Sequence, residues 1–187
     1  MRFTNLYCFQ IMKLKSVLFI GLFVIFPGII FGPLLVTGVW HLRHGNFVKC
    51  ADKQIMVPPR WYPTVKPRSV IFVKLAPTVF TNHIIKAYIA MSAVSKPPET
   101  REETEQFYKN FGSIYWTKLA RDKEVVEGPV RIGSGTTEAF CMHSFPQDNR
   151  NWAHDMCIVF QGAWSADFQG RNEDRETFYK VILAPPR

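Results

Sequence analysis

The sequence predicts an α+β fold, a twisted antiparallel sheet flanked by helices and preceded by one N-terminal transmembrane helix. Residues 16–40 form a run of 25 residues without a charge. A helix of that length crosses a bilayer core of roughly 30 Å. After this run, predicted strands follow one another in two groups, and a predicted helix follows each group. That order is typical of an antiparallel sheet covered by helices, rather than of alternating βαβ units.

The uncharged run divides the chain into three parts. Residues 1–15 are predicted to be a short cytoplasmic N-terminus, because the basic residues before the run favour that side of a membrane. Residues 16–40 are predicted to be a transmembrane anchor or an uncleaved signal, since the apolar core is long and no Ala-x-Ala sequence ends it. Residues 41–187 then form an extracytoplasmic domain, and the chain is a single-pass protein of the inner membrane.

The charge pattern argues against a nucleic-acid-binding domain. The net charge is +8, but residues 41–187 hold 20 of the 23 Lys and Arg together with all 15 acids, which leaves +5. The nearest approach to a basic patch is scattered among apolar residues, at Lys66, Arg68, Lys74 and Lys86. A solvated strand face explains this spacing better than an anion site. We therefore expect no nucleic-acid partner, and no motif predicts a cofactor.

The first half of the domain is predicted to be mostly strand, because β-branched residues dominate between proline and glycine boundaries. A hairpin is expected first, and Pro58 and Pro59 end it because proline donates no ladder hydrogen bond. Trp61, Tyr62 and Pro63 then form an aromatic corner. The strands predicted in this half are residues 46–50, 54–57 and 69–75. Residues 83–95 fit either a strand or an amphipathic helix, and the strand is favoured.

The second half is predicted to add two helices to further strands. Thr100 and Glu103 match a capping box, so a helix should begin there. An apolar stripe continues this helix from Phe107 to Leu119. The Gly128–Pro129 pair is expected to break the chain. The remaining predicted elements are strands at 130–134, 136–145 and 155–164, and a last helix at 172–183.

A possible pairing of two strands places several reactive residues together. If residues 140–145 and 153–160 pair around the loop at 146–150, symmetry about position 149 fixes the register. Cys141 then lies opposite Cys157, His143 opposite Asp155, and Ser144 opposite His154. Because side chains alternate along a strand, Cys141, Cys157, His143 and Asp155 share one face, and a slip of one residue would move them all to the other.

Three interpretations of that face stay open. The first is a disulfide between Cys141 and Cys157, since directly opposed residues are near enough and exported domains form disulfides. The second is a pair of buried, reduced cysteines that pack as small hydrophobic residues. The third is a metal or nucleophile site, for which the candidates are His143, His154, Asp155 and Cys157. No Cys-x-x-Cys spacing supports it.

Large aromatic side chains supply a candidate contact surface at Trp61, Tyr62 and Trp152. Tryptophan and tyrosine combine a large apolar body with a polar group, and they are enriched where proteins bind partners. Trp152 follows a polar loop, which favours exposure of its side chain.

Two parts of the sequence resemble a known family. Residues 157–162, 168–170 and 178–182 suggest a last strand, a glycine-bearing turn and a terminal helix. Residues 55–61 are similar to the "strand, Pro, x, Trp" opening of PsbP-like domains, which are α/β/α proteins with a twisted antiparallel sheet. The chain also resembles small membrane-anchored bacterial proteins of unknown function. It departs from plant PsbP in its N-terminal anchor, and no functional residue carries over.

The resemblance implies a non-enzymatic accessory or interaction domain, tethered to a membrane and facing the periplasm or the cell exterior. Its expected partners are the membrane itself and a membrane protein. The alternative is an exported metal-binding protein or hydrolase that uses His143, His154, Asp155 and Cys157.

Overall fold

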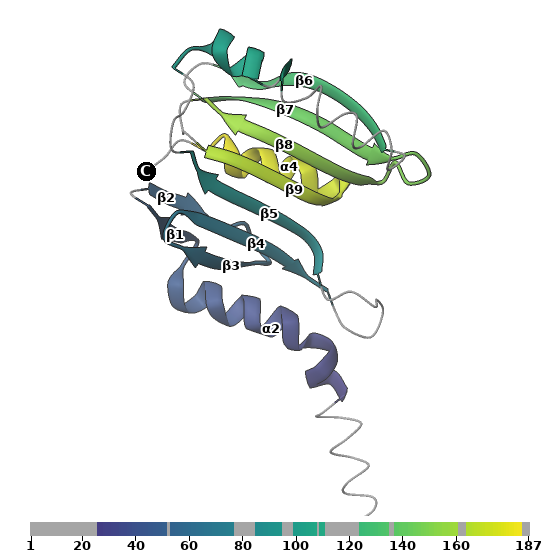
Figure 1. The fold of residues 1–187 in the computed structure, drawn as a ribbon. Helices are drawn as coiled ribbons and strands as arrows, with labels where there is room; N and C mark the ends of the chain where they lie inside the picture. The colour runs from purple at the N-terminus through teal and green to yellow at the C-terminus, as the bar shows by residue number, and fades with distance from the viewer. Residues whose placement is uncertain are drawn as a thin grey trace, which may run out of the picture.

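The computed structural model describes residues 26–51, 53–76, 85–94, 99–107, 109–110, 124–134, 137–160 and 164–184. Seven antiparallel strands form one sheet in the order β3-β4-β5-β9-β8-β7-β6, and β1 and β2 form a separate hairpin beside it (Figure 1). The strands are β1 Phe47–Cys50, β2 Lys53–Met56, β3 Trp61–Lys66, β4 Ser69–Leu75, β5 Ile85–Ala93, β6 Glu124–Ser134, β7 Thr137–Pro146, β8 Trp152–Val159 and β9 Trp164–Arg171. The helices are α2 Phe26–His44 and α4 Asn172–Ile182, and residues 101–107 are also helical.

The predicted helix-flanked α+β fold is wrong, because the described chain is mostly β. Three segments account for the difference. The predicted aromatic corner is the edge strand β3, and the predicted glycine-bearing turn is part of β9. The expected break at Gly128–Pro129 is only a shift of register inside β6, with a cis peptide bond at that step. All three segments were predicted to interrupt strands because they contain glycine or proline, but these residues also occur within strands, at bulges and sheet edges.

The predicted transmembrane anchor also needs correction. Residues 1–25 lie outside the described residues, so only residues 26–40 of the predicted span are described, and they belong to α2, which covers Phe26–His44. Among the described helices, none is long and apolar enough to cross a membrane. The reason in α2 is its composition, since it contains prolines and glycines and its last turn carries His41, Arg43 and His44. This finding contradicts the single-pass anchor and the inner-membrane location that depended on it.

Several local predictions are confirmed. The hairpin β1–β2 has the expected bounds to within one residue, and residues 85–93 form a strand. The capping box forms as well, because Thr100 Oγ1 accepts from the Glu103 amide at 3.1 Å and the Glu103 carboxylate accepts from the Thr100 amide at 3.4 Å. Of the apolar stripe assigned to this helix, Phe107 is 51% exposed, and residues 111–119 lie outside the described residues.

The first face of the sheet carries the main core and packs against α4. Phe178, Val181 and Ile182 of α4 are buried on it, and the Phe178 ring stacks on Phe168 with centroids 5.3 Å apart. Gly170 leaves room for a close contact between strands, because a Cβ there would lie 2.5 Å from the Ala87 Cβ. One cross-strand row on this face runs through all seven strands: Pro63, Phe72, Ile89, Phe168, Asp155, His143 and Glu127.

The second face of the sheet is more polar. Its matching row is Tyr62, Val73, Tyr88, Gln169, His154, Ser144 and Val126. Near β6 and β7 this face is buried around Phe140, Met142 and Ile158. There Arg101, from the helical segment, and Arg131 both pair with the buried Glu138, at 2.9 Å and 2.6 Å.

Both edge strands of the sheet contain a proline. Pro63 lies within β3, and Pro129 lies at the register shift of β6. On the β3 edge, the Trp61 carbonyl lies 3.1 Å from Nε2 of His41 in α2, and the Lys66 carbonyl accepts from the Cys50 thiol of β1 at 3.7 Å. Because proline offers no amide donor and these carbonyls have side-chain partners, each edge is interrupted as a template for another strand.

Candidate functional site

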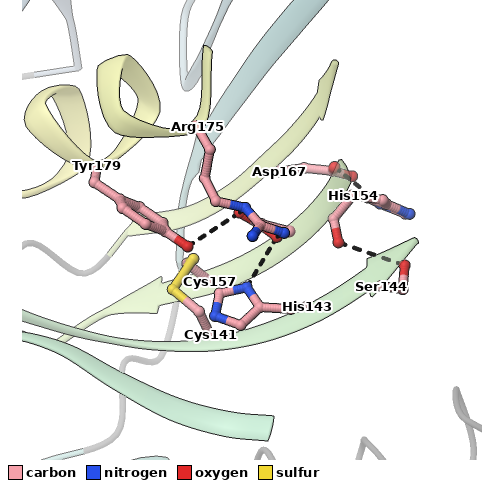
Figure 2. A network of polar contacts seen from close by, with 9 residues as sticks. Cys141, His143, Ser144, His154, Cys157, Asp167, Arg175 and Tyr179 are labelled. Atoms are coloured by element: carbon pink, nitrogen blue, oxygen red, sulfur yellow. Dashed lines mark hydrogen bonds and ion pairs between the residues drawn. A yellow bond between two sulfur atoms is a disulfide. The ribbon is translucent and has the colours of Figure 1, made fainter. Parts of the chain in front are cut away.

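The polar side chains that are most deeply buried meet on the first face of the sheet, beneath α4. Asp155 is fully buried, and Nδ1 of His143 lies 2.8 Å from its Oδ1. Arg175 Nη2 donates to the same oxygen at 2.9 Å, and its Nε lies 2.8 Å from Oδ2. The Tyr179 hydroxyl donates to Oδ2 at 3.2 Å. We call these four residues the Asp155 network (Figure 2).

Strand register and helix periodicity bring the network together. His143 and Asp155 are direct partners across β7 and β8, as the sequence predicted. Arg175 and Tyr179 are four residues apart on α4, so they lie on the same side of that helix. Figure 2 shows both side chains reaching from α4 toward the strands, with the Cys141–Cys157 disulfide beside them. The network therefore links two strands of the sheet to the helix that covers them.

Both sulfur atoms of the predicted cysteine pair lie next to this network. Cys141 and Cys157 are direct partners across β7 and β8, their Cα atoms are 4.1 Å apart, and a disulfide joins them. Both residues are buried in the main core. Of the three interpretations that the sequence left open, the structure contains the disulfide.

Three side chains surround the Asp155 carboxylate, and each has a nitrogen or hydroxyl group within hydrogen-bonding distance of it. A carboxylate only accepts hydrogen bonds, so the proton of the His143–Asp155 contact belongs to Nδ1. Burial and the nearby Asp155 charge raise the pKa of Tyr179, although Arg175 opposes this, so its hydroxyl stays protonated and donates. Among the described residues, no hydrogen bond joins His143 to a hydroxyl or thiol nucleophile.

A second pair of polar residues lies on the opposite face of the sheet. Nε2 of His154 lies 3.1 Å from Oδ1 of Asp167 and 3.5 Å from the side-chain nitrogen of Gln169. Burial lowers the pKa of His154, but the hydrogen bond to Asp167 and the charges of Asp167, Glu124 and Asp155 outweigh burial, and the pKa is raised. His154 is thus poised to hold a proton against a carboxylate.

The four residues proposed for a metal or hydrolase site do not come together. His143 and Asp155 lie on the first face, whereas His154 lies on the second, and the sulfur of Cys157 is in the disulfide. Within the part of the chain that the structure describes, no group of three or more His, Cys, Asp or Glu is placed to hold a metal ion. Even so, the register that first suggested these residues is confirmed.

The three aromatic residues proposed as a contact surface divide between the two faces. Trp61 is only 2% exposed and packs in the main core, so it cannot belong to an exposed surface. Tyr62 and Trp152 are partly exposed on the second face, at the β3 and β8 positions of the sheet. Their role in binding stays a prediction.

Sequence reasoning missed the helical half of the network, Arg175 and Tyr179. The apolar stripe of α4 gave the available signal, because Phe178, Val181 and Ile182 fix its buried side and the two missed residues flank that stripe at helical spacing. It also missed Asp174 in the first turn of α4, which is buried and pairs with Lys74 of β4 at 2.5 Å. This ion pair ties the start of the helix to the sheet.

Comparison with known proteins adds no family assignment. The chain matches no protein-family model and no curated protein. The resemblance to PsbP-like domains therefore stays a prediction.

The raised pKa of His154 predicts a pH-dependent contribution to stability. Because the pKa of His154 is higher in the folded protein than in the unfolded protein, where it is about 6.5, protonation stabilises the fold. This contribution is complete at pH values below the unfolded pKa, and it is lost as the pH rises through the folded pKa. We expect the wild type to exceed the His154→Gln variant in free energy of unfolding by more at about pH 5.5 than at about pH 9. Urea titrations of both proteins at the two pH values measure this difference. A constant gap between them would contradict it.

Proposed function

We propose that this chain is a non-enzymatic interaction domain that binds an apolar helix of a partner protein through the outward side of α2. One observation carries the proposal. Six large apolar side chains of α2 are 38–88% exposed, namely Phe31, Leu34, Leu35, Val36, Val39 and Leu42. A contiguous exposed apolar surface marks a binding site more often than chance, because water is a poor solvent for it.

The domain holds α2 by its other side. Thr37 is buried, and Trp40 packs against the main core. His41 contacts the Trp61 carbonyl of β3 at 3.1 Å and the Asn46 side chain at 3.0 Å. In Figure 1, α2 lies beside β3 and leads away from the sheet toward its N-terminal end. The exposed side chains are therefore presented on a helix whose last turns are fixed.

The surface of α2 suits another helix as its occupant. A Cβ built at Gly28, Gly32 or Gly38 would meet nothing within 4 Å among the described atoms. Gly28 and Gly32 are four residues apart, so they lie on one side of the helix and extend the row toward Leu35 and Val39. Small residues at this spacing let a second helix approach closely, and the large side chains next to them pack into its grooves. The helix has no acidic residue in its first turn, and it carries basic residues only in its last turn.

The buried polar groups support a non-enzymatic role. The Asp155 network satisfies its carboxylate internally, and the two core cysteines form a disulfide. A catalytic base needs a reacting group within hydrogen-bonding reach. In the described part of the chain, Nδ1 of His143 lies 2.8 Å from Asp155, and the hydroxyl group of the neighbouring Tyr179 ring donates to the same carboxylate rather than to His143.

Crosslinking from α2 tests the proposal. A photoreactive amino acid in place of Leu35 of the full chain should give a covalent adduct with one partner protein in its native host. The double variant Leu35→Lys/Val39→Lys should abolish co-purification of that protein. Because these side chains are exposed, the free energy of unfolding should change by less than about 0.5 kcal/mol per substitution.

A matched control makes the same chemical change elsewhere. Val130 is 39% exposed on β6, so Val130→Lys places a new charge on a different exposed apolar position. This control should leave the partner bound. An adduct with lipid alone, or partner recovery that survives the double variant, would contradict the proposal.

A further inference from the structure

A cavity at one end of the sheet lies apart from both the Asp155 network and α2. Its volume is about 630 Å³, and it is lined by Asn149, Asn151, Trp152, Arg171, Asn172 and Glu173. These residues come from the loop between β7 and β8, the paired ends of β8 and β9, and the first turn of α4. Figure 1 shows that loop and the start of α4 at the same end of the sheet. The volume is within the range of about 300–1,000 Å³ that small-molecule sites occupy.

The charges around the cavity favour an uncharged ligand. Arg171 Nη1 lies 4.0 Å from Glu173 Oε1, so the positive and negative side chains of the cavity partly neutralise one another. The N-terminus of α4 would attract an anion, but Glu173 and Asp174 already place two carboxylates in its first turn. An anionic ligand would meet the Glu173 carboxylate, and a cationic ligand would meet the Arg171 guanidinium.

The amide side chains are held in place before any ligand binds. The Asn149 side-chain oxygen accepts from the Asn151 amide at 3.2 Å, and the Asn172 side-chain nitrogen donates to the Arg150 carbonyl at 2.6 Å. A side-chain amide has both a donor group and an acceptor group, so each keeps one for a further partner. Polar groups that are already oriented lose little entropy when they bind. The cavity therefore offers fixed donors and acceptors at its rim.

Trp152 gives the same cavity an apolar wall. Its side chain is partly exposed, and it starts β8 directly opposite Arg171 of β9. A pyranose ring is the ligand chemistry that combines these needs, because one of its faces presents C–H groups and its edge presents hydroxyl groups. The C–H face packs on an indole ring, while the hydroxyl groups both donate to and accept from amides, carboxylates and guanidinium groups.

We infer that this cavity is a binding site for a neutral carbohydrate, with Trp152 as the stacking platform and the asparagines, Arg171 and Glu173 as hydroxyl partners. The site does not depend on the helix-binding function proposed for α2. The sheet order separates β8 from β3, the strand next to α2, by four strand spacings, or about 19 Å. An experiment can therefore disprove the carbohydrate site without disproving helix binding by α2, and the reverse also holds.

Nuclear magnetic resonance of the full chain tests the site with maltotriose, cellotriose and triacetylchitotriose as probes. The indole N–H signal of Trp152 is assigned as the one that disappears in Trp152→Phe. We expect at least one probe to shift this signal in a saturable way. The Trp152→Ala and Asn151→Ala variants should each raise the apparent Kd for that probe at least tenfold, and Asn151 is exposed, so its variant should fold normally.

A matched control removes an aromatic ring elsewhere on the same face of the sheet. Tyr62 is partly exposed on β3, so Tyr62→Ala should leave the probe bound with unchanged Kd. The inference is overturned if none of the three probes shifts the Trp152 signal. It is also overturned if inorganic phosphate shifts that signal as strongly as the sugars do, or if Tyr62→Ala weakens binding as much as Trp152→Ala does. None of these variants should change the Leu35 crosslink.

Discussion

Replacing Asp155 with alanine is expected to lower the free energy of unfolding by about 3–5 kcal/mol, because it removes the shared acceptor of a buried charged network. The Asp155 carboxylate is fully buried, and it contacts His143, Arg175 and Tyr179. Without it, Arg175 has a charge with no counterion at this position, and two further donors lose their acceptor. Urea unfolding followed by circular dichroism, under oxidising conditions, measures the loss.

Asp167 provides the comparison for this variant. Its side chain is 38% exposed, and its ion pair is with His154 on the opposite face of the sheet. Partly exposed ion pairs contribute little, so Asp167→Ala should cost less than about 1 kcal/mol. Equal losses for the two variants would show that the Asp155 network does not hold α4 to the sheet.

Removing the disulfide is the second large expected effect. The Cys141–Cys157 bond closes a loop with a sequence separation of 16 residues, and loss of a crosslink of that size lowers stability by about 3 kcal/mol through the entropy of the unfolded chain. The double variant Cys141→Ala/Cys157→Ala should show this loss in urea unfolding. Wild-type protein unfolded with a reductant present should approach the stability of the double variant.

Cys50 is the control for the reductant. It is buried in the core, outside the disulfide, and its thiol donates to the Lys66 carbonyl. Burial raises the pKa of this thiol, while a backbone hydrogen bond at Ala51 opposes that shift, so the thiol stays protonated and unreactive. Cys50→Ala should therefore keep the full response to reductant. If reductant has no effect on the wild type, the disulfide does not contribute to stability as expected.

The pairing of β7 with β8 could be predicted because two physical constraints act together. A short polar loop fixes where the chain reverses, and alternation along each strand decides which side chains share a face. Those constraints were enough to place His143 opposite Asp155 and Cys141 opposite Cys157. They could not decide between thiols and a disulfide, since that outcome depends on oxidation as well as distance.

The errors of sequence reasoning have physical causes too. Residues 61–63 were predicted to form a corner that contains Pro63, yet they begin the edge strand β3, where proline is tolerated. Gly170 made residues 168–170 read as a turn, but this glycine lies in a strand where Ala87 approaches closely. The apolar stripe of α4 shows which side of the helix Arg175 and Tyr179 flank, but their partner Asp155 lies on β8 and is identified only by the packing of the helix on the sheet. The anchor was predicted from a long uncharged run flanked by basic residues, but the described helix α2 continues past this run into His41, Arg43 and His44 and is not apolar enough to cross a membrane.

The prolines of β3 and β6 and the side chains of His41 and Cys50 have a consequence for assembly. These features interrupt the main-chain ladder that a neighbouring molecule would have to continue in order to lengthen this sheet. Assembly through side-chain shape and chemistry is therefore favoured over strand addition, and single substitutions on the surface can alter such contacts without changing the size of the sheet.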